Sequence, residues 1–161
     1  MSPTRPDLVA CWLFRIDTGG HLEILLIRRA PDRLFPGIWQ CVTGKLEVGE
    51  RILAGALREV VEETGLDRSA LEAVFETDIV NWFHEETSDA IWCEAVFAAR
   101  VVPGATPAIS DEHDDLRWTS PDEARGLVPW PAYVRAIDFV EWLVANPDRA
   151  EPFRLLLDSA S

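Results

Sequence analysis

The stretch from Gly44 to Leu66, GKLEVGERILAGALREVVEETGL, is the most informative part of the sequence. Small and apolar residues recur in it at helical spacing, which predicts a helix with one face toward a core: Leu53, Ala56, Leu57, Val60 and Thr64. Gly65 suits the left-handed residue that ends many helices. The stretch therefore predicts a packed helix that begins after a glycine-containing turn and ends at a glycine.

Four glutamates accompany this predicted helix: Glu50, Glu59, Glu62 and Glu63. The last three are spaced i, i+3 and i+4, so they lie in one patch beside the apolar face. Like charges at this spacing repel one another, and a divalent cation would remove that penalty. Carboxylate oxygens suit Mg²⁺, which also binds phosphates. A charge run is usually a solvated helix face, but the glycines and Arg58 at fixed offsets favour a metal site.

Together, Gly44, Glu50, Arg58-Glu59, Glu62-Glu63 and Gly65 have the identities and spacing of the Nudix box. The chain therefore resembles the Nudix hydrolases, which cleave nucleoside diphosphates linked to another group. The resemblance implies an α/β (α+β) protein with the Nudix fold, a mixed β-sheet sandwiched between α-helices. It also implies one Nudix domain over residues 1–161 and a requirement for Mg²⁺, with Mn²⁺ as a second candidate.

The resemblance assigns roles to particular residues. The implied metal ligands are Gly44, through its carbonyl, Glu59, Glu62, Glu63 and Glu112. Arg58 is expected to orient Glu59 by a forked hydrogen bond, and either Glu59 or Glu112 is expected to be the general base. Glu50 is expected to support the start of the helix. His113 is interpreted as a surface residue of the acidic loop SDEHDD, which is itself also compatible with simple solvation.

The segments around the box narrow the resemblance. WQCVTGKLEVGE, EHDDLRW and PWPAYVRAIDFV are similar to parts of bacterial dihydroneopterin triphosphate pyrophosphatases, although Lys45 stands where many Nudix proteins have a second glycine. Candidate substrate-binding residues are Arg28, Lys45, Trp39 and Trp82. The alternatives are that Arg28 is only the polar end of a strand and that the tryptophans are core residues.

The expected function is Mg²⁺-dependent hydrolysis of a phosphoanhydride in a nucleoside or pterin triphosphate, either dihydroneopterin triphosphate or a dNTP, releasing a monophosphate and pyrophosphate. One alternative is a hydrolase of a nucleoside diphosphate linked to a sugar or a second nucleotide. Another is a non-catalytic nucleotide sensor, although the intact set of box carboxylates counts against it. No signature of a diadenosine-polyphosphate, NADH or coenzyme A hydrolase is evident.

The composition limits the class of partner. With a formal net charge of −13, the chain is not expected to bind nucleic acid or anionic membranes, so the expected partner is a small-molecule substrate. Cys11, Cys41 and Cys93 form no CxxC pair, and the N-terminus lacks a signal peptide, which together indicate a cytoplasmic protein. A homodimer is compatible with the resemblance, although the sequence shows no interface.

Hydrophobic patterns outside the helix predict the remaining elements. A hairpin is expected at 8–14 and 22–27, a loop at 30–37, a strand at 39–42, and long strands at 71–83 and 90–102. A loop at 103–115, a last strand at 116–119 and helices at 121–125 and 131–144 complete the pattern, and residues 153–157 are apolar enough to pack. The pattern alone indicates α/β or α+β.

Overall fold

The computed structural model describes residues 3–157. The predicted hairpin is present as β1 (Leu8–Ile16) and β2 (Leu22–Arg29), which pair antiparallel across the DTGG turn. Gly20 in this turn has φ +83°, a conformation that favours glycine. Most of β1 and the middle of β2 are buried, because both strands are covered on both faces.

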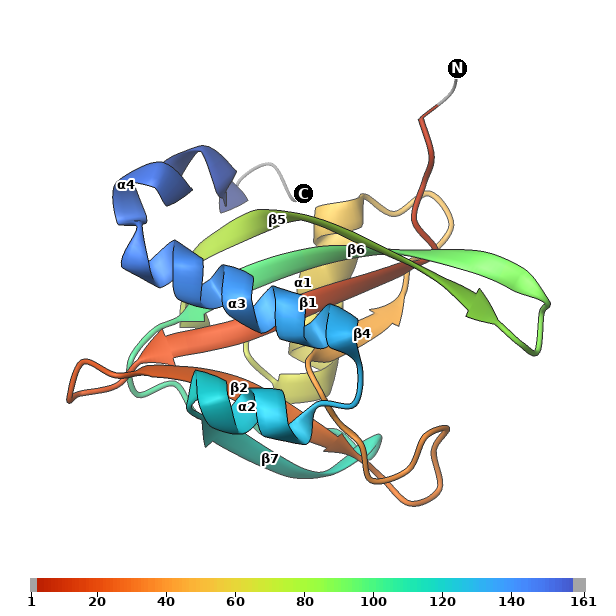
Figure 1. The fold of residues 1–161 in the computed structure, drawn as a ribbon, viewed down its shortest axis with the longest axis horizontal. Helices are drawn as coiled ribbons and strands as arrows, with labels where there is room; N and C mark the ends of the chain where they lie inside the picture. The colour runs from red at the N-terminus through yellow and green to blue at the C-terminus, as the bar shows by residue number, and fades with distance from the viewer. Residues whose placement is uncertain (1–2, 158–161) are drawn as a thin grey trace.

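A mixed sheet of eight strands forms the centre of the described chain (Figure 1). Its main order is β3 (Trp39–Gln40), β2, β1, β6 (Ala90–Val101), β5 (Leu71–Glu85) and β8 (Arg154–Leu155). In addition, β4 (Val42–Lys45) pairs with β1, and β7 (His113–Thr119) pairs with β2. The long strands β5 (Leu71–Glu85) and β6 (Ala90–Val101) form the second hairpin, and β1 pairs parallel with β6. The other pairings are antiparallel.

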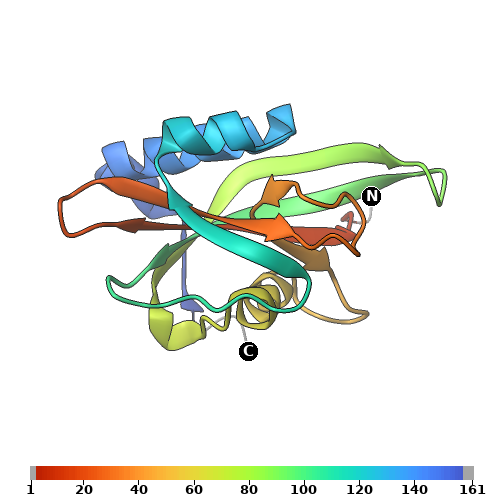
Figure 2. The same ribbon diagram turned by 90° about the horizontal axis from the view of Figure 1, so that it is seen from below.

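Helices cover the two faces of the sheet separately (Figure 2). On one face lies α1 (Ile52–Thr64), and on the other lie α2 (Pro121–Leu127) and α3 (Pro131–Ala145). Each face has its own apolar core: Val60 of α1 packs with Val9 and Leu13, whereas Ile137 of α3 packs with Trp12 and others. The expected sandwich of a mixed sheet between helices is therefore confirmed.

Two predicted strands have different boundaries in the structure. The stretch 39–42 does not form one strand but is divided at Cys41 into β3 (Trp39–Gln40), which pairs with β2, and β4 (Val42–Lys45), which pairs with β1. The last strand, β7 (His113–Thr119), begins three residues before Leu116, because His113 already pairs with Arg29 of β2. The predicted loop therefore ends at residue 112.

The segment after α3 packs against the body of the protein, as predicted for residues 153–157. It contains α4 (Pro147–Ala150), a 3₁₀ turn (Glu151–Phe153) and the short strand β8 (Arg154–Leu155), which pairs with β5. Phe153 meets Phe139 and Trp142 of α3 at ring-centroid distances of 5.5 and 5.8 Å. Hence α3 is held from its C-terminal end as well as by the sheet.

Candidate active site

Helix α1 presents its carboxylates around a single arginine. Arg58 makes a forked pair of hydrogen bonds, but the partner of the fork is Glu50, at 2.8 and 3.1 Å, and not Glu59 as expected. Single bonds reach Glu59 at 2.7 Å, Glu62 at 3.1 Å and the Lys45 carbonyl at 3.0 Å. All five N–H donors of a guanidinium are thereby used. Arg58 ties the helix to the turn before it, and the hydrogen bond to Arg58 lowers the pKa of Glu50.

Glu63 and Glu59 are the buried members of the group. Glu63 is 3% exposed and accepts a hydrogen bond from the Thr43 backbone N–H at 3.3 Å. Burial, together with the nearby charges of Glu59 and Glu112, raises the pKa of Glu63 to about 8. Burial also raises the pKa of Glu59, against the opposing effect of Arg58. These carboxylates are therefore destabilised as anions in the absence of a cation.

The loop that contains Glu112 places this residue near Glu59 and Glu63. Backbone bonds from Ala108 to the Thr64 carbonyl, 2.8 Å, and from Ser110 to the Glu63 carbonyl, 3.3 Å, attach this loop to the end of α1. The negative charge of Glu112 consequently raises the pKa of both Glu59 and Glu63. Its own carboxylate lies 3.7 Å from Arg29. The structure thus brings the carboxylates of the predicted helix and of the loop together, although they lie far apart in the sequence.

The surroundings fit a hard divalent cation by their chemistry. Gly44 lies so close to Glu59 that a Cβ at this position would overlap the carboxylate. A glycine therefore lets the Glu59 oxygens approach the backbone of β4. No three His, Cys, Asp or Glu side chains within residues 3–157 are already arranged to hold a metal ion, and Glu62 is engaged by Arg58. Like charges and oxygen donors nonetheless form the type of ligand set that Mg²⁺ prefers.

The four candidate substrate-binding residues lie in different environments. Arg28 forms an ion pair with Asp114 at 2.7 Å, and Trp39 is only 8% exposed, with the guanidinium groups of Arg28 and Arg117 at 5.6 and 4.7 Å from its ring. Lys45 is exposed beside Gly44. Trp82 is 58% exposed on β5, opposite Cys93. The Lys45 ammonium lies 5.1 Å from the centre of the Trp92 ring, whereas Arg28 and Trp39 form a group at β2, β3 and β7.

His113 is not the surface residue that its acidic loop suggested. It is 4% exposed, its Nε2 lies 3.4 Å from the side-chain nitrogen of Gln40, and its Nδ1 has no hydrogen-bond partner in the described chain. Burial and the charges of Arg29 and Arg33 lower its pKa to about 4. The acidic composition of SDEHDD concealed this burial, because the strand β7 begins inside it.

A second buried carboxylate was not among the predicted site residues. Glu94 of β6 is 5% exposed and accepts hydrogen bonds from the Thr43 hydroxyl at 3.2 Å and the Asn81 amide at 2.8 Å. It lies on the α3 face of the sheet, next to the chain position that precedes Gly44. A charged residue inside the apolar run AIWCEAVFAARV was the available sequence signal.

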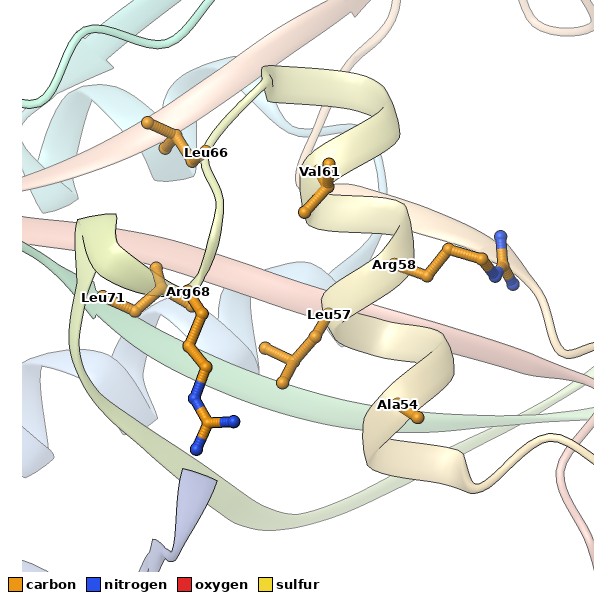
Figure 3. Close-up of a pocket in the computed structure, with 7 residues that line it drawn as sticks. All are labelled: Ala54, Leu57, Arg58, Val61, Leu66, Arg68 and Leu71. Carbon is orange, nitrogen blue, oxygen red and sulfur yellow. The ribbon is translucent and has the colours of Figure 1, made fainter. Parts of the chain in front are cut away.

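A groove beside α1 shares Arg58 with this group of carboxylates. Its lining is mainly apolar and includes Leu57, Val61, Leu66 and Leu71. Figure 3 shows that the Arg58 side chain extends away from these leucines. The carboxylates that Arg58 contacts therefore lie on another side of the helix from the groove.

Comparisons with known proteins agree with this geometry. Residues 4–143 match the NUDIX domain. The chain is 33% identical over 112 residues to an octanoyltransferase from Myxococcus xanthus, covering 70% of the chain and 30% of that protein. It is 30% identical over 125 residues to the nucleoside triphosphatase NudI of Escherichia fergusonii, covering 74% of the chain and 85% of NudI.

A solved structure extends the comparison to the fold. The dihydroneopterin triphosphate pyrophosphohydrolase of E. coli superposes with a TM-score of 0.70 at 24% identity, over 88% of this chain and 97% of that one. The chain spans less than a third of the first curated relatives that it matches. The box residues, the sandwich and the family match over residues 4–143 lead to one conclusion: the chain belongs to the Nudix family.

Proposed function

We propose that this chain, as a single Nudix domain over residues 1–161, is a Mg²⁺-dependent pyrophosphohydrolase of a nucleoside or pterin triphosphate. The observation that carries the proposal is the convergence of Glu59, Glu63 and Glu112 near Gly44, where burial and mutual repulsion disfavour their charged forms. A polyanionic substrate that arrives with a divalent cation would relieve that repulsion. The name of the E. coli neighbour supports a pterin triphosphate as one substrate, and that of NudI supports nucleoside triphosphates.

The residues of the site would have three roles: binding the metal ion, orienting a carboxylate and accepting a proton. Glu59, Glu62, Glu63, Glu112 and the Gly44 carbonyl would hold Mg²⁺, or Mn²⁺ in its place. The ion supplies charge neutralisation on the phosphates and lowers the pKa of bound water. Arg58 keeps Glu59 oriented through its 2.7 Å bond. Glu59 or Glu112 would take the proton from the attacking water.

Lys45 would attract the substrate phosphates, since it is exposed and directly follows Gly44. Arg28 would need to leave Asp114 before it could contribute. Trp82 remains a candidate for ring stacking because more than half of its surface is exposed.

The test is phosphate release with and without added inorganic pyrophosphatase. The panel contains dihydroneopterin triphosphate, the four dNTPs, a dinucleotide and a nucleoside diphosphate sugar, each with Mg²⁺, Mn²⁺ or EDTA. Phosphate that requires both the metal and the coupling enzyme supports the proposal. If monophosphates form only from the dinucleotide and the nucleoside diphosphate sugar, the result would favour a hydrolase of linked nucleoside diphosphates. No turnover with any compound would favour a nucleotide sensor. The variants Glu62→Gln and Glu63→Gln should nearly abolish turnover while the thermal unfolding transition persists.

The proposal places the enzyme in the cytoplasm with a small-molecule partner. Its three cysteines are free, buried thiols, which suits a reducing compartment. No helix within residues 3–157 is long and apolar enough to cross a membrane. A homodimer belongs to the same proposal, and the exposed apolar residues Val80, Trp82 and Ile91 of the β5–β6 hairpin are its candidate interface. Light scattering of wild type and Trp82→Ser would test it.

A further inference from the structure

Glu94 is a buried carboxylate that the proposed reaction does not use. Its side chain lies on the α3 face of the sheet, opposite the face that carries α1, because Val96, two residues along β6, packs with α3. No arginine or lysine of residues 3–157 forms an ion pair with it. An unpaired carboxylate in such a place is costly unless hydrogen-bond donors compensate it. Burial accordingly raises the pKa of Glu94.

The carboxylate has spare capacity for hydrogen bonds. Oε1 accepts from the Thr43 hydroxyl and Oε2 from the Asn81 amide. Two carboxylate oxygens offer about four acceptor positions, so roughly one remains on each oxygen. Two adjacent acceptors match a ligand that presents two parallel N–H donors, in the manner of a bidentate pair.

Aromatic side chains continue outward from Glu94 along the same face. Phe83 pairs with Trp92 in the step of the β5–β6 ladder beyond Asn81 and Glu94, about 7 Å along the strands. Phe83 is 40% exposed, and the Lys45 Nζ lies 5.1 Å from the centre of the Trp92 ring. Arg135 of α3 reaches Asn81 through a long bond of 3.3 Å. Ring surface at Phe83 and Trp92 therefore lies next to the hydrogen-bonding edge of Glu94, which is itself only 5% exposed.

Thr43 connects this position to the proposed reaction site. Its hydroxyl donates to Glu94, whereas its backbone N–H donates to Glu63 on the other face. Gly44 and Lys45 follow directly in β4. A ring held at Glu94 would thus carry its phosphates along the Thr43–Lys45 edge toward Glu59 and Glu63.

We infer that Glu94 selects substrates whose ring presents a ring N–H beside an exocyclic amino group, the 2-amino-4-oxopyrimidine edge that guanine and pterins share. The inference rests on the proposed function and narrows its substrate class. Adenine and cytosine offer an acceptor nitrogen beside the amino group, thymine has only one N–H on that edge, and hypoxanthine lacks the amino group. Each of these would leave part of the buried carboxylate unpaired.

The test compares dGTP with dITP, which differ only in the 2-amino group. In the wild type, kcat/KM for dGTP should exceed that for dITP by about tenfold or more. A site that binds the 2-amino donor rejects the analogue that lacks it. In Glu94→Gln the ratio should fall to about one, mainly through loss of dGTP turnover. Glu76→Gln makes the same chemical change at an exposed position of β5 and should leave the ratio at the wild-type value.

Each contrary result has a separate meaning. Turnover without discrimination in wild type overturns the inference and leaves the proposed function standing; this measurement needs no variant. An equal loss for dGTP and dITP in Glu94→Gln also overturns it, because Glu94 then serves only to hold Thr43. If no triphosphate is hydrolysed, the proposed function fails, and calorimetric binding of dGTP and dITP decides: tighter dGTP supports the inference, and equal affinities overturn it.

Discussion

Glu63 couples the protonation of the site to the stability of the protein. Burial raises the pKa of Glu63 to about 8 in the folded protein, above its ordinary value of 4.5, so the folded state holds the proton more tightly. The stabilisation is fully present below pH 4.5 and is lost as the pH rises through 8. His113 has the opposite effect, because its lowered pKa adds stability as the pH rises from about 4 to 6.5. The effect of Glu63 is therefore best isolated above pH 6.5.

We predict that the metal-free protein loses unfolding free energy between pH 6.5 and 8.5, by roughly 1–3 kcal/mol. Urea denaturation in EDTA at several pH values measures this slope. Glu63→Gln, which cannot titrate, should flatten it. Equal slopes in wild type and variant would show that Glu63 does not hold a proton in this range.

Gly44 is predicted to be required for activity more than for stability. A Cβ at this position would overlap the Glu59 carboxylate, whose displacement would disturb the site while leaving the two cores intact. Gly44→Ala should lower kcat by about 100-fold or more, because misplacing a reacting group is costly. Gly126→Ala is the matched control, since its Cβ would meet nothing within 4 Å. Activity of Gly44→Ala equal to that control would contradict the assigned position of Glu59.

Arg58 should not be replaceable by lysine. Lysine cannot reproduce a fork to Glu50 together with bonds to Glu59 and Glu62. Arg58→Lys should therefore reduce kcat by about tenfold to a thousandfold, equivalent to roughly 1–4 kcal/mol. Steady-state kinetics at saturating Mg²⁺ measure the change. A variant that changes only KM would place Arg58 in substrate binding and not in orienting Glu59.

Helix α1 packs against the sheet through one face. Val60 is fully buried, whereas its neighbour Val61 is 45% exposed. Val60→Ala should destabilise the protein by about 1–3 kcal/mol through lost packing, and Val61→Ala should change stability by less than about 0.5 kcal/mol. Thermal or chemical unfolding of both variants checks this difference. Similar losses would mean that the outer face of α1 is covered in solution.

The elements that sequence predicted well are those with a long, regular pattern. The helix from 52 to 64 and the hairpins appear because each has an apolar period that its packing satisfies. β7 was predicted too short because the polar residues His113 and Asp114 belong to a strand whose pairing with β2 is a tertiary property. Spacing also placed Arg58 beside Glu59, but the fork to Glu50 depends on how the preceding turn folds back onto α1.

The sheet separates two acidic regions, and Thr43 donates a hydrogen bond to each of them. Glu63 faces α1 and Glu94 faces α3, and no pattern in the sequence indicates that one residue of β4 contacts both. Only the topology, with β4 beside β1 and β1 beside β6, brings positions 43 and 94 together. The α1 carboxylates were therefore predictable from local spacing, whereas the second carboxylate required the order of the strands.

The net charge of −13 should oppose the approach of a polyanionic substrate over long distances. Nearby cations offset little of this, because Arg58 is saturated by its own partners and Arg28 and Arg33 are paired with Asp114 and Asp111. Raising NaCl from 20 to 150 mM at constant free Mg²⁺ should therefore lower KM by about two- to threefold, since salt screens the repulsion. Lys45→Gln, which removes an exposed positive charge, should make KM fall more steeply with increasing salt. A KM that rises with salt in wild type would instead show that local attraction at Lys45 outweighs the charge of the whole molecule.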